Sequence, residues 1–127
     1  MQEKFLFEYA ILRVVPRVER EEFLNVGVIL FCKKQKFLET RFHLDEARLT
    51  CFCAKINVAE IMENLRSFER IGKGEEEGGS IGKLDVASRF RWLTATRSTV
   101  VQTSKVHPGF STDLSKALTK LYEQFVL

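Results

Sequence analysis

Hydrophobic positions in the first 44 residues fall into three consecutive segments, which predict an antiparallel meander. The segment 5–15 (FLFEYAILRVV) is rich in aromatic and branched side chains and stops before Pro16, as expected for a strand. The segment 23–32 (FLNVGVILFC) is apolar except at Asn25 and Gly27, which suits a central strand covered on both faces. A third strand, 37–44, follows the turn 33–36, and the charged segment 17–22 joins the first two. In the third strand a period of two places Phe37, Glu39, Arg41 and His43 on one face and Leu38, Thr40, Phe42 and Leu44 on the other.

Helical spacing replaces this pattern farther along the chain. Asp45 is a predicted N-cap for a short helix over 46–49, and Asn57 for a longer one over 58–71 that ends at Gly72. A final helix is expected over 113–125. The longer helices have apolar faces made of Val58, Ile61, Met62, Leu65, Phe68 and Ile71, and of Leu114, Ala117, Leu118, Leu121 and Phe125.

The remaining segments complete the expected fold. The range 73–82 predicts a flexible, acidic, glycine-rich loop. A structured segment over 88–95 (SRFRWLTA) and a fourth strand over 98–106 follow, with His107 in a turn beside Pro108 and Gly109. The prediction is one α+β domain over residues 1–127, with a mainly antiparallel sheet of four to five strands covered by the two longer helices.

Composition adds limits rather than an activity. The chain has 127 residues, 45% hydrophobic and 29% charged, which is typical of one soluble domain. A net charge of +3 does not commit the protein to nucleic acid or to an anionic membrane. We identify no signal peptide or membrane-spanning segment and expect a cytoplasmic protein. The odd number of cysteines then favours reduced thiols over disulfides.

Motifs for cofactor or metal chemistry are not recognisable. The residues around Gly82-Lys83 lack the spacing of a P-loop, and no Gly-x-Ser-x-Gly motif is present. Possible metal ligands lack the spacing of a zinc site, and the cysteines are interpreted as small apolar core residues. We therefore expect no metal and no cofactor, and favour a protein that is not an enzyme. The possible ligands considered are Cys32, Cys51, Cys53, His43 and His107.

The most informative segment is basic and aromatic. No acidic residue occurs over 86–112, where three arginines alternate with aromatic and neutral polar residues. This combination suits phosphate, carboxylate or single-stranded nucleic acid. The alternative is structural, with the aromatic residues in the core and the arginines paired to glutamates. The residues concerned are Arg89, Phe90, Arg91, Trp92, Arg97, Ser98, Thr99, Gln102 and Thr103.

Three sequence blocks together carry a family resemblance. YAILRVVP, EEFLNVGVILF and RFRWLTATRSTVVQTSKVHPG resemble, in order and spacing, a family of small bacterial proteins known only as a domain of unknown function. The resemblance implies a bacterial cytosolic protein and brings no established activity, cofactor or catalytic residue. It also implies, by gene association, a kinase-like protein of the toxin–antitoxin type as a partner.

We therefore expect a non-enzymatic binding or regulatory module that docks a protein partner through a basic polar groove around Arg13, Arg89, Arg91, Arg97 and Gln102. One alternative is nucleic-acid binding through the same groove. Another is a hydrolase or nuclease that uses Glu22, His43 and His107. The oligomeric state stays open. The candidate binding residues are Arg13, Glu22, Asn25, Arg89, Arg91, Trp92, Arg97, Ser98, Thr99, Gln102 and His107.

Overall fold

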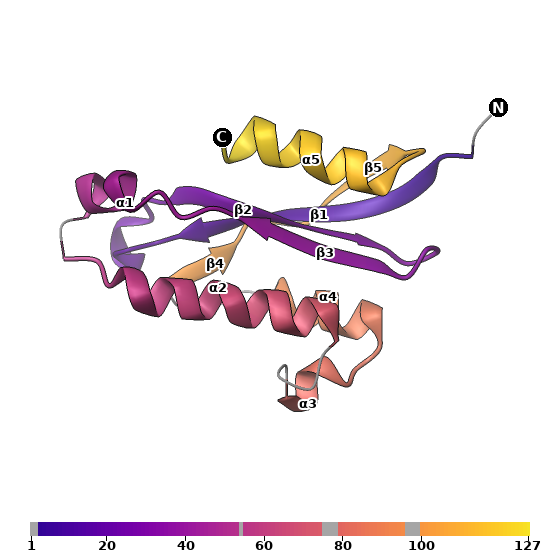
Figure 1. The fold of residues 1–127 in the computed structure, drawn as a ribbon, viewed down its shortest axis with the longest axis horizontal. Helices are drawn as coiled ribbons and strands as arrows, with labels where there is room; N and C mark the ends of the chain where they lie inside the picture. Colours follow the sequence, from indigo (N-terminus) through magenta and orange to yellow (C-terminus); the bar gives the residue numbers. More distant parts are fainter. Residues whose placement is uncertain (1–2, 54, 75–78, 96–99) are drawn as a thin grey trace.

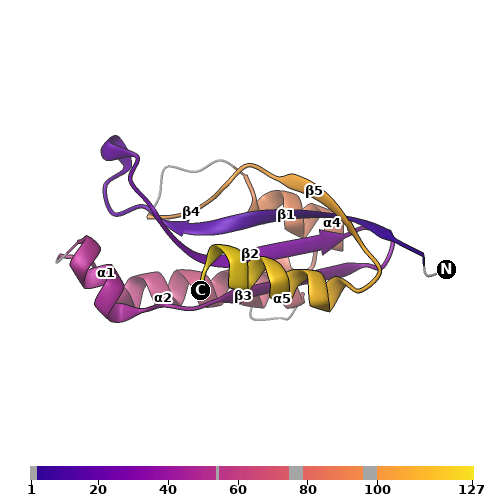
Figure 2. The same cartoon turned by 90° about the horizontal axis from the view of Figure 1, so that it is seen from above.

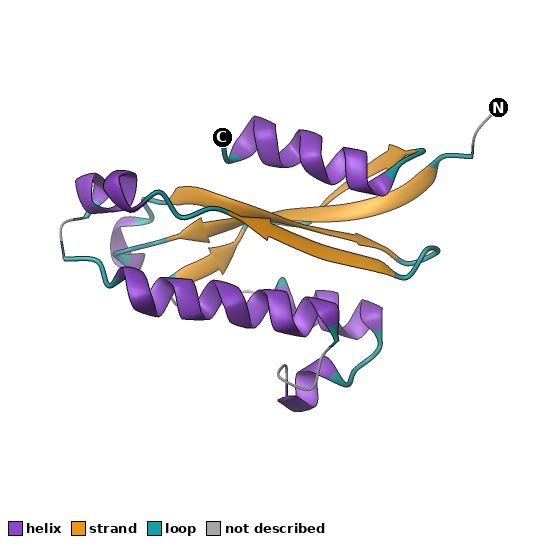
Figure 3. Ribbon diagram, in the orientation of Figure 1, coloured by secondary structure: helices purple, strands orange, loops and turns teal. Residues whose placement is uncertain are grey.

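The computed structural model describes residues 3–53, 55–74, 79–95 and 100–127, and it confirms the α+β class (Figure 1, Figure 3). Five antiparallel strands form one sheet in the order β3-β2-β1-β4, and β5 also pairs with β1. One edge of β1 is therefore taken by β2, and the other is shared by β4 and β5. The strands are β1 (Phe5–Val14), β2 (Leu24–Cys32), β3 (Phe37–Phe42), β4 (Val101–Thr103) and β5 (His107–Ser111), and a short 3-10 helix, η1 (Val18–Arg20), lies between β1 and β2.

The predicted meander of the first three strands is confirmed. A fourth strand is present in the predicted range but is shorter than predicted, and a fifth strand follows where a turn was expected. Of the expected strand over 98–106, residues 98 and 99 lie outside the described residues, and within 100–106 only the short β4 is a strand. His107 begins β5 instead of lying in a turn. Pro108 is tolerated because β5 is an edge strand, where a missing N–H need not break a ladder. Gly109 is required because a Cβ atom there would lie 2.5 Å from the Phe7 ring.

Four of the five helices begin at capping side chains. The side chains of Asp45, Asn57, Asp85 and Asp113 each accept a hydrogen bond from the backbone N–H three residues later, which satisfies a donor that the helix leaves unpaired. The predicted caps at Asp45 and Asn57 and the C-terminal helix are thus confirmed. The helices are α1 (Glu46–Phe52), α2 (Val58–Lys73), α3 (Gly79–Gly82), α4 (Val86–Leu93) and α5 (Leu114–Phe125).

The end of α2 differs from the prediction. Gly72 lies inside the helix, and Gly74 is the left-handed C-cap, with φ of 72°. The expected loop over 73–82 contains α3, while its acidic run at 75–77 lies outside the described residues.

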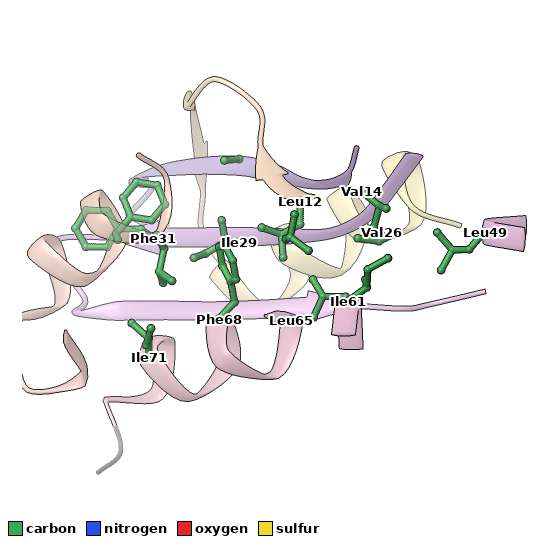
Figure 4. Close-up of a cluster of buried hydrophobic side chains, with 14 residues drawn as sticks. Leu12, Val14, Val26, Ile29, Phe31, Leu49, Ile61, Leu65, Phe68 and Ile71 are labelled. Atoms are coloured by element: carbon green, nitrogen blue, oxygen red, sulfur yellow. The ribbon is translucent and has the colours of Figure 1, made fainter. Parts of the chain in front are cut away.

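The sheet lies between two helical layers, with α2 and α4 on one face and α5 on the other (Figure 1). Alternate side chains of β1 enter different cores: Leu12 and Val14 pack toward α2, and Phe7 and Ile11 pack toward α5. Figure 4 shows the first core, where the Phe31 ring stacks on Phe90 of α4 with centroids 4.8 Å apart. Burial on both faces explains the nearly continuous apolar sequence of β2.

A β-bulge interrupts the pairing of β1 with β2. Leu12 lies opposite Gly27, but the next residue, Arg13, lies opposite Asn25, so β2 contributes an extra residue at this point. A Cβ atom at Gly27 would lie 2.6 Å from the Arg41 carbonyl oxygen and 2.9 Å from Phe42 Cβ. Only glycine fits between these strands without a backbone shift.

Two glycine substitutions test this packing. We expect Gly27→Ala to lower the free energy of unfolding by about 1–3 kcal/mol, because the added methyl group meets backbone atoms. Gly72→Ala is the matched control: its Cβ would lie 3.6 Å from Thr40 Oγ1, an ordinary contact. It also removes glycine from a helix interior, so its unfolding free energy should be unchanged or higher by up to about 1 kcal/mol. Urea denaturation of both variants measures the difference, and equal losses would contradict this packing.

Candidate functional site

The candidate site is a part of the sheet that α5 leaves uncovered. Helix α5 packs mainly on β2, and Figure 2 shows β1, β4 and β5 beside the helix rather than beneath it. The side chains that β1, β4 and β5 present there include polar groups that are only partly buried. We name this surface the α5-side strip and define it as Tyr9, Arg13, Gln102 and His107.

Strand alternation and register bring these residues to one face. Tyr9 and Arg13 share the α5 face of β1 because Leu12 and Val14 occupy the opposite face. Directly paired residues of antiparallel strands extend their side chains to the same side. The pairings Arg13 with Gln102 and Tyr9 with His107 therefore complete the strip from β4 and β5.

Arg13 has the most unusual environment in the strip. Its guanidinium carbon lies 3.9 Å from the centroid of the Phe23 ring, a cation–π geometry, and its Nε is buried without a hydrogen-bond acceptor. Within the described part of the chain it makes no ion pair. Burial lowers the pKa of Arg13 from its ordinary value, because desolvation disfavours the charged form. Arginine nevertheless remains a cation at neutral pH, so the strip holds a positive charge for which the described residues supply no counter-ion.

The C-terminal end of α5 borders the strip through aromatic and amide contacts. The centroid of the Tyr9 ring lies 5.5 Å from the centroid of the His107 ring and 6.5 Å from that of the Phe125 ring. Asn25, which pairs with Arg13 in the sheet, donates its side-chain N–H to the Phe125 carbonyl oxygen at 3.2 Å. Four predicted site residues, Arg13, Asn25, Gln102 and His107, thus belong to one face of the sheet.

Two other predicted arginines lie on the opposite face. Arg89 donates from Nη1 to the carbonyl oxygens of Ile71 and Gly72, at 3.1 and 2.9 Å, at the end of α2. Arg91 makes a two-pronged ion pair with Glu8, with distances of 2.8 and 3.0 Å. The sequence-based grouping of Arg13 and Gln102 with both of these arginines in one groove was therefore wrong. Both arginines belong to α4, and this helix covers the face of the sheet on which Phe90 packs in one core with Leu12.

Of the other predicted binding residues near α4, only Trp92 is among the described residues. Trp92 lies on α4, away from the strip, with 41% of its surface exposed. Arg97, Ser98 and Thr99 lie outside the described residues. Among the described residues, the predicted site therefore keeps its members on β1, β2, β4 and β5.

The residues of the expected catalytic group are separated. Glu22 forms an ion pair with Arg20 and lines a cavity beside Phe52. His43 lines a different cavity with Asn25, and His107 contacts Tyr9. No shared acid–base site is formed from these three described residues, so the hydrolase hypothesis has no geometric support.

The three cysteines have different environments. Only Cys32 is a core residue, whereas Cys51 is exposed and Cys53 is partly exposed, so the prediction of core thiols was wrong for these two. All three thiols are free.

Among the described residues, no group of three or more His, Cys, Asp or Glu side chains is placed to hold a metal ion. None of the described helices combines the length and apolar character needed to span a bilayer.

Sequence reasoning missed two features near these residues. Phe23, which stacks on Arg13, and Phe125, which borders Tyr9, were assigned only to strand or helix cores. The second feature is a cleft around Arg17 and Lys55, which connect elements and carry no motif. The period of two in β1 is a signal that places Tyr9 and Arg13 on the same face of the strand, but pairing between distant strands has no such signal.

The structural roles of Arg89 and Arg91 predict different costs of substitution. Arg89→Ala should lower the unfolding free energy by about 1–3 kcal/mol, since two carbonyl groups at the end of α2 lose a charged donor. Arg91→Ala should change it by less than about 1 kcal/mol, because the pair with Glu8 is largely exposed to solvent. Thermal and urea denaturation measure both, and a larger effect at Arg91 than at Arg89 would refute this assignment.

Comparison with known proteins identifies the family of this chain. No curated protein matches the chain, and no solved structure matches it. A family model described as "Protein of unknown function (DUF3037)" matches residues 9–126, which include the described strip on β1, β4 and β5. The chain therefore belongs to the DUF3037 family of proteins of unknown function.

Proposed function

We propose that this protein is a non-enzymatic binding module whose α5-side strip receives an acidic segment of a protein partner. The observation that carries the proposal is Arg13, a partly buried guanidinium stacked on Phe23, with its Nε unsatisfied and no carboxylate beside it among the described residues. A carboxylate is the natural complement, because it accepts charge-assisted hydrogen bonds from Nε and Nη in a planar geometry.

The other residues of the strip fit a peptide segment. Gln102 of β4 pairs with Arg13, and farther along β1 the Tyr9 ring, which packs 5.5 Å from the ring of His107 on β5, adds an aromatic surface. Interfaces of this kind place arginine and aromatic residues at their centre and polar groups at the rim. The strip would thus read one acidic side chain together with adjacent polar or apolar ones.

Nucleic acid is a poorer fit to the same surface. A phosphate backbone is usually neutralised by several cations that follow its path. The α5-side strip has one permanent cation, because Arg89 and Arg91 are engaged on the opposite face. A protein partner that presents one or two carboxylates matches this charge better. The family resemblance makes a kinase-like protein of the toxin–antitoxin type the first partner to test.

The test separates binding from stability at Arg13. Arg13→Met keeps an unbranched side chain that packs on Phe23 and removes the desolvated charge. We expect its unfolding free energy to equal or exceed that of the wild type, while the affinity for the kinase-like partner falls at least about tenfold, the range for losing a central charged anchor. Calorimetric titration of the purified proteins measures affinity, and urea denaturation measures stability.

Arg66→Met is the matched control, because Arg66 is an exposed arginine of α2 on the other face. It should bind the partner as the wild type does. Equal affinity of Arg13→Met and wild type would refute the proposed surface. Binding of a DNA or RNA oligonucleotide in place of the protein, with a steep salt dependence and loss in Arg13→Met, would favour the nucleic-acid alternative.

A further inference from the structure

We propose that a second site, separate from the α5-side strip, binds a small amphipathic anion in a cleft at one end of the sheet. Two adjoining cavities of about 290 and 330 Å³ lie between the β1–β2 connection and the α1–α2 connection. They share four lining residues, Pro16, Arg17, Cys53 and Lys55, so together they form one cleft. Their volumes are in the range of small-molecule sites. None of the lining residues belongs to the strip, so the two sites can be tested independently.

The interior of the cleft is largely apolar. Phe52 borders the first cavity, while Ile56, Ile61 and Val100 border the second. Ile61 is anchored in the main core, with 2% of its surface exposed, so this side of the cleft is held by packed structure. Small-molecule sites commonly combine such apolar walls with a few polar groups that orient the ligand.

The charges around the cleft favour an anion. Arg17 and Lys55 line both cavities, are exposed, and form no ion pair with any described residue. A third cation, Arg20, is neutralised by its ion pair with Glu22. Glu60, in the second cavity, is the remaining acidic residue of the lining. The lining thus carries two cations and one carboxylate that form no ion pair among the described residues.

This balance defines the ligand class. The apolar walls call for an aromatic or short aliphatic body, and the two cations call for a single anionic head such as a carboxylate, sulfonate or phosphate. Glu60 would repel a polyphosphate, which carries several negative charges. The inferred ligand is therefore an organic monoanion rather than a nucleotide or a metal ion.

Two fluorescent probes with nearly the same body test this inference. Anilinonaphthalene sulfonate carries the aromatic body and one sulfonate, and N-phenyl-1-naphthylamine lacks the sulfonate. We expect the wild-type protein to bind one molecule of the anionic probe. In Arg17→Ala/Lys55→Ala its Kd should rise about fivefold, and the Kd of the neutral probe should change less than about twofold, since exposed charges contribute modestly.

A charge-matched control and a reverse variant complete the titration. Arg66→Ala/Lys120→Ala removes two exposed cations from α2 and α5 and should leave both Kd values unchanged. Glu60→Gln should tighten the anionic probe about twofold by removing the repulsive carboxylate. Parallel losses of both probes in Arg17→Ala/Lys55→Ala would indicate a structural effect and overturn the proposal, as would equal losses in the control.

Cys53 reports whether the probe occupies this cleft. In Cys51→Ser, Cys53 is the partly exposed thiol, because Cys32 is fully buried. Saturating anionic probe should slow the alkylation of Cys53 by iodoacetamide, an uncharged reagent. Binding without protection of Cys53 would place the probe elsewhere on the protein and overturn the proposal, and so would the absence of saturable binding.

Discussion

The pairing of β1 with β2 holds the rest of the molecule in place. β1 pairs with three other strands, and the alternation of its side chains supplies the apolar cores on both faces. Gly27 lets β2 approach Arg41 and Phe42 of β3 closely, and the bulge beside it aligns Arg13 with Asn25. β1 thus carries residues of both cores and also Arg13, the polar residue around which the candidate site forms.

The arginines on the two faces of the sheet have different environments. On the α2 and α4 face, the two arginines of α4 bind structural partners: Arg89 donates from Nη1 to the carbonyl groups that end α2, although its Nε is buried without an acceptor, and Arg91 binds Glu8. On the α5 face, Arg13 Nε is also buried without an acceptor, and its guanidinium makes no hydrogen bond or ion pair to a described residue. A partly buried cation lowers the stability of the fold unless a partner supplies its counter-ion. Binding sites commonly contain such groups, which are unfavourable in the free protein and satisfied in the complex.

Local patterns in the sequence predicted most of the fold. The period of two, the helical spacing and the caps at Asp45 and Asn57 depend on neighbouring residues, and the structure confirms them. The site was harder to predict because it depends on pairings between distant residues. Arg89 and Gln102 are close in the sequence, and we grouped them in one groove. In the structure, Arg89 binds the end of α2 on one face of the sheet, whereas Gln102 pairs with Arg13 on the other. The close approach of the Phe7 ring explains the glycine at position 109, and no local sequence pattern indicates that approach.

The most direct test of this division between faces is an NMR titration with the kinase-like protein proposed above as a partner, in which the arginine side-chain Nε–H signals are followed. The account predicts that the Arg13 signal and the backbone amides of β4 and β5 shift on binding, while the signals of Arg89 and Arg91 stay in place. Shifts confined to Arg89, Arg91 and α4, with Arg13 unchanged, would contradict it.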